Sequence, residues 1–153
     1  MPNKIVATNR SARHDYQIEE VLEAGIVLTG TEVKSLRRGS CSLKGGFARV
    51  ENGEVLLFDV YIAPYLEGNR YNPDPRRPRK LLLKRPQIAR LTGLTELRGY
   101  TLVPLQVYFK DSFAKVELAV AKGLPKYDKR EKIKRKEAQR EMERAIKSAR
   151  YAR

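Results

Sequence analysis

Apolar and polar residues alternate over much of the first 121 positions, and alternation of this kind is typical of β-strands. It predicts strands at Phe47–Val50, Val55–Ile62, Thr101–Phe109 and Phe113–Ala121. The spacing in Tyr16–Leu28 fits either a bulged strand or a short helix, and Gly25 favours the strand because a glycine there would break a helix but can accommodate a bulge.

The residues between these segments favour hairpins. Asn52-Gly53 joins Phe47–Val50 to Val55–Ile62, and both residue types tolerate the positive φ angles of a tight hairpin turn. The short Lys110-Asp111-Ser112 stretch joins the last two. Leu81-Leu82-Leu83 is interpreted as a buried strand or as the entry to a helix. We therefore expect five or six antiparallel strands.

Two short helices interrupt this pattern. The first is predicted over Thr29–Gly39, where Thr29 is a capping residue and Gly39 a stop. The second is predicted from Pro86 to about Leu91, ended by Gly93. A chain of this length cannot form a sandwich with helices on top, so a small closed or nearly closed barrel is predicted, because closure removes exposed strand edges.

Two segments show no period. Pro2–His14 is polar and basic, and it is predicted to be an arm. Glu67–Arg79 holds three prolines and four arginines, and it is predicted to be an extended, mobile, basic loop. The domain boundaries expected from these patterns are an arm over 1–15, a barrel body over 16–122 and a tail over 123–153.

Charge sets the tail apart from the body. Residues 122–153 carry thirteen Lys/Arg against five Asp/Glu, a net +8 out of +14 for the whole chain. The tail has too few large apolar side chains to build a core, so it is expected to be disordered alone and to fold on a polyanion. A stripe of small and apolar residues at helical spacing makes a helix induced by binding the preferred form, with permanent disorder as the alternative; the stripe is Ala138, Met142, Ala145, Ile146 and Ala149.

Enzymatic readings find little support. The chain has one cysteine, Cys41, and one histidine, His14, so neither a disulfide framework nor a Cys/His metal site is expected. Neither glycine-rich phosphate-loop spacing is present. No apolar run suggests a signal peptide or a membrane span, and a cytoplasmic, non-enzymatic protein without metal or cofactor is predicted.

The basic side chains favour RNA instead. Arg76, Arg77, Arg79 and Lys80 follow Tyr71, and guanidinium groups beside a tyrosine can hold phosphates while the ring stacks on an unpaired base. The alternative for this stretch is a solvated basic loop. Lys34 and Arg37 on the first helix give a weaker signal of the same kind.

Five blocks of sequence, in order, resemble the small protein B family, the tmRNA-binding proteins of bacterial trans-translation. The blocks are Asn9–Tyr16, Glu23–Gly25, Gly30–Arg37, Arg79–Leu83 and Lys115–Gly123, the last followed by Tyr127–Glu131. Leu124-Pro125 departs from the family, which usually has two lysines after the glycine. The resemblance implies an oligonucleotide-binding (OB)-like antiparallel β-barrel flanked by three helices, the third assigned to a turn near Thr95–Arg98.

The resemblance also implies a function. Members of this family bind the tRNA-like domain of tmRNA, help its alanylation and carry it into the A site of stalled ribosomes, with the tail along the vacant message channel. The expected partners are therefore tmRNA and small-subunit ribosomal RNA, with elongation factor Tu and alanyl-tRNA synthetase reached through tmRNA. The chain is expected to act as a monomer. A ribosomal protein with an RNA-threading tail is the alternative.

Residue roles follow from the matching blocks. The resemblance implies tmRNA binding by seven residues: Asn9, Glu23, Lys34, Arg37, Arg79, Lys80 and Leu82. It implies contacts with the ribosome and its decoding centre by eight others: His14, Tyr127, Asp128, Lys129, Arg130, Lys132, Lys134 and Arg135.

Overall fold

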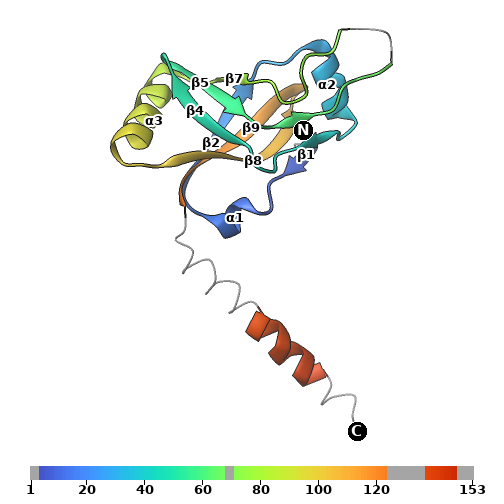
Figure 1. Ribbon diagram of the computed structural model, residues 1–153, viewed down its shortest axis with the longest axis vertical. Helices are drawn as coiled ribbons and strands as arrows, with labels where there is room; N and C mark the ends of the chain where they lie inside the picture. Colours follow the sequence, from blue (N-terminus) through green and yellow to red (C-terminus); the bar gives the residue numbers. More distant parts are fainter. Residues whose placement is uncertain (1–3, 68–70, 124–136, 148–153) are drawn as a thin grey trace. The chain divides into compact units, whose positions relative to one another are not determined.

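Six strands of the body close into an antiparallel barrel (Figure 1). Each pairs with the next in the order β8, β4, β5, β7, β2 and β9, and β9 pairs back onto β8. The predicted mainly β fold and its closure are confirmed. The strands are β2 (Tyr16–Ile26), β4 (Phe47–Glu51), β5 (Glu54–Phe58), β7 (Arg79–Leu82), β8 (Thr101–Lys110) and β9 (Phe113–Gly123).

This computed structural model describes residues 4–67, 71–123 and 137–147. The chain divides into two units, 1–123 and 124–153. No helix among the described residues has the length and apolar character needed to cross a membrane.

The predicted turns lie where their residue types require. Asn52 and Gly53, between β4 and β5, have φ angles of 49° and 76°. Asp111 and Ser112, between β8 and β9, have φ angles of 49° and 72°. The hairpins are therefore confirmed. The predicted strand Val55–Ile62 is interrupted, because Asp59 takes a φ of 57° and ends β5, after which β6 (Tyr61–Ile62) pairs with β3 (Cys41–Ser42).

The barrel interior is filled by alternate residues of its strands. Leu57, Leu81, Leu102 and Leu118 are at most 1% exposed and belong to one cluster. The residues between them face outward, as strand geometry dictates. On β8 and β9, part of this outer side is also buried, in a second cluster that includes Val103, Ala119 and Ala12.

Ala12 belongs to the segment Pro2–His14, which was wrongly predicted to be an arm without regular structure. The predicted arm contains β1 (Lys4–Thr8), which pairs antiparallel with β8, and α1 (Ala12–Asp15). Ladder hydrogen bonds to β8 and burial of Ala12 order a segment whose own periodicity is too weak to predict an element. This α1 is also the third helix that the resemblance implies, so its assignment near Thr95–Arg98 is wrong.

The two predicted helices are present, at opposite ends of the barrel as drawn in Figure 1. In α2 (Gly30–Arg37) the Thr29 hydroxyl accepts a hydrogen bond from the Glu32 amide, and the Glu32 carboxylate accepts one from the Thr29 amide. The second helix, α3 (Arg85–Leu97), passes through Gly93 instead of ending there. Burial of Leu91 on the barrel offsets the cost of a helical glycine, which is about 1 kcal/mol.

Residues 137–147 of the tail are helical, and all of them are exposed. The helical spacing of Ala138, Met142, Ala145 and Ile146 is thus confirmed over the described part. Three acidic and three basic residues balance within it. Folding only on a partner stays a prediction, and Ala149 lies outside the described residues.

Candidate nucleic-acid interface

One outer surface of the barrel brings together several of the residues predicted to bind RNA. Lys80 and Leu82 alternate with the buried Arg79 and Leu81, so they face outward from β7. Gly25 pairs with Leu82, and Glu23 lies two residues earlier on the same side of β2. Lys115 of β9 pairs with Gly25 from the other side. We call Glu23, Gly25, Lys80, Leu82 and Lys115 the β2–β7 face.

Leu82 lies close over Gly25, and a larger residue at position 25 would require the leucine to shift by a few tenths of an ångström. A Cβ atom at position 25 would lie 3.2 Å from Leu82 Cβ, which is tighter than ordinary van der Waals contact. The leucine is 52% exposed even so. A large apolar side chain that packs over a glycine and stays half exposed is available to contact a partner.

Glu23 is held by two neighbours on β8. Its Oε2 accepts a hydrogen bond of 2.5 Å from the Tyr108 hydroxyl, and its Oε1 lies 3.6 Å from Lys110 Nζ. The Tyr108 hydrogen bond, and then the charges of Lys110 and Lys115, hold the pKa of Glu23 below its ordinary value despite some desolvation. The side chain is therefore an ionised, oriented acceptor, as contact with base amino groups or ribose hydroxyls requires.

A cleft of about 210 Å³ adjoins this face. Leu82, Phe113 and Lys115 line it together with Phe109 and with Val33 of α2. Phe113 is 70% exposed at the β8–β9 turn. The cleft thus combines exposed apolar and aromatic surface with the cation of Lys115, which is a composition that suits a folded RNA.

The α2 helix extends the positive charge to the edge of this cleft. The Arg37 guanidinium carbon lies 5.0 Å from the centre of the Phe109 ring, so Arg37 borders the cleft. Lys34 turns elsewhere: its Nζ lies 5.4 Å from the centre of the Tyr65 ring, which Arg38 also covers. The structure therefore brings Arg37, but not Lys34, to the cleft.

Arg79, which the sequence predicts to contact RNA, is instead buried within the protein. The side chain is 1% exposed. Its Nε donates to Glu32 Oε2 at 2.6 Å, its Nη1 to the Val60 carbonyl at 2.7 Å and its Nη2 to the Pro75 carbonyl at 3.0 Å. Arg79 lies two residues before Leu81 on β7, so both side chains point to the interior of the barrel. The hydrogen-bond donors of Arg79 are used within the protein.

Glu32 is the centre of this buried cluster. Arg77 Nη2 donates to its Oε1 at 2.5 Å, in addition to the bond from Arg79. Desolvation alone would raise the pKa of Glu32, but the hydrogen bonds from Arg77, the Thr29 amide and Arg79 outweigh it and hold the pKa below the ordinary value. The cluster ties α2 to the 71–78 loop and to β7, so the predicted basic loop is in part fixed.

Asn9 also has a structural place. It is 8% exposed, its Nδ2 donates to the Pro104 carbonyl at 3.0 Å, and its Oδ1 accepts from the Ser11 hydroxyl. These bonds fix the connection between β1 and α1 on β8. A direct contact of Asn9 with RNA does not fit this burial.

Of the eight residues predicted to contact the ribosome, the structure describes one. His14 lies exposed on α1. The other seven, from Tyr127 to Arg135, lie outside the described residues. Within the parts of the chain that the structure describes, no cluster of three or more His, Cys, Asp or Glu could hold a metal ion.

Sequence reasoning missed Tyr108, Lys110 and Phe113. Each belongs to β8, to β9 or to the turn beside them, and each reaches Glu23 or Leu82 only through the closed sheet. The single available signal was the pair of cations, Lys110 and Lys115, around a turn with an exposed aromatic residue.

Comparison with known proteins gives a consistent result. The SmpB protein family model matches residues 6–148. The SsrA-binding protein of Geobacillus thermodenitrificans is 63% identical over 143 residues, covering 94% of this chain and 92% of the relative. That of Listeria welshimeri is 56% identical over 144 residues, with 94% of each chain covered.

A solved structure points the same way. It is named "tmRNA-SmpB: a journey to the center of the bacterial ribosome", and it matches with a TM-score of 0.65 and 54% sequence identity. The match covers 78% of this chain and 84% of that chain. With its closed barrel, its three flanking helices and these relatives, the chain belongs to the SmpB family.

Proposed function

We propose that this protein is an RNA-binding adaptor that binds the tRNA-like domain of tmRNA and delivers it to the A site of stalled ribosomes. One observation carries the proposal: the chain is 54% identical to a solved chain whose name joins tmRNA, SmpB and the bacterial ribosome. The relatives at 56–63% identity are named for binding SsrA RNA.

The β2–β7 face is proposed as the surface that reads the tRNA-like domain. Leu82 supplies apolar contact, Glu23 supplies an oriented acceptor, and Lys80 and Lys115 supply phosphate contacts. Arg37 adds a cation at the edge of the neighbouring cleft. Phosphate contacts position the RNA, whereas Glu23 and Leu82 distinguish its shape from that of other RNAs.

The tail is proposed to act on the ribosome. Its net +8 suits ribosomal RNA, and the helix over 137–147 carries an exposed Met142 and Ile146 that a groove can cover. Tyr127 and the cations from Lys129 to Arg135 are proposed to contact the decoding centre. His14 on α1 is proposed to face the ribosome as well.

The adaptor is proposed to work as a cytoplasmic monomer without chemistry of its own. Elongation factor Tu and alanyl-tRNA synthetase are proposed to meet it through tmRNA, since the synthetase aminoacylates a tRNA-like end and the factor binds the aminoacylated product. The catalytic step of tagging then belongs to the ribosome.

The test is purification of the full chain from bacterial cells, followed by RNA identification and a peptide-tagging assay on ribosomes stalled at the end of a truncated message. Recovery of tmRNA in excess of its cellular share, with tagging that requires the protein, is expected. Recovery in every small subunit irrespective of stalling, without tmRNA, would instead identify a ribosomal protein.

A further inference from the structure

The barrel has a gap between β4 and β8. These strands are joined by a single residue pair, Ala48 with Leu102, whereas β4 and β5 share five pairs. Thr95 and Glu96, at the C-terminal end of α3, lie beside this pair. A cavity of about 410 Å³ occupies the gap, and this volume falls in the range of small-molecule sites.

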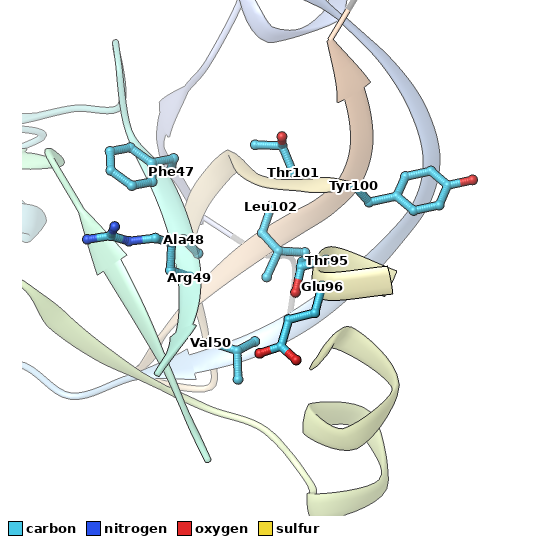
Figure 2. A pocket seen from close by; sticks show the side chains of 9 residues that line it. All are labelled: Phe47, Ala48, Arg49, Val50, Thr95, Glu96, Tyr100, Thr101 and Leu102. Atoms are coloured by element: carbon cyan, nitrogen blue, oxygen red, sulfur yellow. The ribbon is translucent and has the colours of Figure 1, made fainter. Parts of the chain in front are cut away.

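The walls of this cavity are mostly apolar, with polar groups at its mouth. Ala48, Val50 and Leu102 line it, and Figure 2 shows the Glu96 carboxylate beside Val50. Among the described residues Glu96 has no ion-pair or hydrogen-bond partner, and it is exposed. A flat ligand lying on the partly exposed Val50 would meet this exposed carboxylate at its edge.

Aromatic and cationic side chains lie on both sides of the opening. Phe47 lines one side and stacks on Phe58, with the Arg49 guanidinium carbon 4.6 Å from the Phe58 ring centre. Tyr100 lines the other side, with Lys122 Nζ 4.7 Å from its ring centre. Figure 2 shows Phe47 and Tyr100 at opposite sides of the cavity.

We propose that the β4–β8 cavity, lined by Val50, Glu96 and Leu102, binds one unpaired base of single-stranded RNA, with Arg49 and Lys122 at the flanking phosphates. The base lies on Val50, whose aliphatic side chain is partly exposed, and an apolar surface of this kind tolerates any base. The Glu96 carboxylate selects among them. Guanine presents two adjacent donors on its Watson–Crick edge, whereas uracil presents one donor between two carbonyls that repel a carboxylate.

This site is separate from the β2–β7 face. None of Glu23, Gly25, Lys80, Leu82 or Lys115 lines it. The inference rests on the proposed function only in taking RNA as the partner class, and it adds a base preference for guanine at a second surface.

The test uses the full chain, labelled for amide NMR, titrated at about 0.15 M salt with the trinucleotides r(AGA) and r(AUA). We expect r(AGA) to shift the amides of Val50, Glu96 and Thr101 and to bind at least about fivefold more tightly than r(AUA), a difference within the range of a good bidentate contact. Glu96→Gln should reduce the difference to less than about twofold. Glu19→Gln, at an exposed acid on β2, is the matched control and should preserve the difference.

Two results would overturn the proposal. One is equal binding of both trinucleotides by the wild-type chain. The other is a set of shifts confined to the tail or to the β2–β7 face. Leu82→Asp separates this proposal from the proposed function. It should weaken binding of the tRNA-like domain while leaving binding of r(AGA) unchanged. Loss of both in Leu82→Asp would refute a separate site.

Discussion

Arg79 and Lys80 are neighbours in sequence with opposite tasks, and their alanine variants should separate stability from RNA binding. Arg79 is buried in the cluster with Glu32, whereas Lys80 is 47% exposed beside Glu54. Arg79→Ala is expected to destabilise the body, and Lys80→Ala is expected to change its stability by no more than about 0.5 kcal/mol.

The magnitude for Arg79→Ala follows from what the substitution leaves behind. Removing one partner of a buried pair costs about 3–5 kcal/mol. Arg77 still pairs with Glu32 and moderates this loss, but the Val60 and Pro75 carbonyls lose their donors, and an unsatisfied buried acceptor costs about 1–3 kcal/mol. We therefore expect about 3–5 kcal/mol in total, equivalent to a fall in Tm of roughly 10–20 °C for a body of this size.

The assay is urea unfolding followed by far-UV circular dichroism, since the chain has no tryptophan. RNA binding is measured in parallel at temperatures where both variants are folded. Lys80→Ala should weaken binding and lower the salt slope of log K by about one, because one phosphate contact is lost. An Arg79→Ala variant with wild-type stability and weakened RNA binding would refute the structural role of Arg79.

Three further predictions concern pH, the Glu23 site and the tail. Because the pKa of Glu32 is lowered in the folded state, its contribution to stability is present above the ordinary pKa of 4.5 and is lost as pH falls through the folded pKa. The unfolding free energy of Glu32→Gln, measured with urea, should therefore depend less on pH in that acid range than the unfolding free energy of the wild type. An equal pH dependence would contradict the role of Glu32 in the buried cluster. Tyr108→Phe removes the hydrogen bond that lowers the pKa of Glu23 most, so a carboxyl-carbon NMR titration should show this pKa rising toward its ordinary value; no change would show that Lys110 and Lys115 suffice. Met142→Pro in the middle of the tail helix should cost about 3 kcal/mol of helix stability and block peptide tagging while RNA-domain binding stays intact; tagging at the normal rate would show that tail charge alone acts.

The turns and most strands could be predicted because their signals are local. Asn52-Gly53 has few alternatives to a tight turn, and Thr29 with Glu32 places a helix start. The β1 strand could not be predicted, because its order comes from pairing with β8, about a hundred residues later. Gly93 misled for the same reason: packing of α3 on the barrel outweighs a local helix-breaking preference.

The candidate site could be predicted where it depended on residue type. It could not be predicted where it depended on whether a side chain points into or out of the barrel. Three consecutive leucines do not reveal which side chain faces out; the burial of Arg79 and Leu81 on the inner side of β7 leaves Leu82 on the outer side. The parity shared with Leu81 placed Arg79 inside, but proximity to a run of arginines made it look like an RNA contact. Tyr108 and Lys110 joined the site through closure of the sheet, which no local pattern encodes.

The β2–β7 face is proposed to distinguish the tRNA-like domain of tmRNA from other RNAs. The most direct test of this proposal is the ratio of Kd for an unrelated tRNA to Kd for the tRNA-like domain, measured at physiological salt for the full chain, for Leu82→Asp and for the control Leu97→Asp. Leu97 is 86% exposed at the end of α3, away from the face, so its substitution adds the same charge to the surface elsewhere. We predict that the ratio stays at its wild-type value in Leu97→Asp and falls about tenfold or more in Leu82→Asp, with Tm nearly unchanged in both. An unchanged ratio in folded Leu82→Asp would contradict the account.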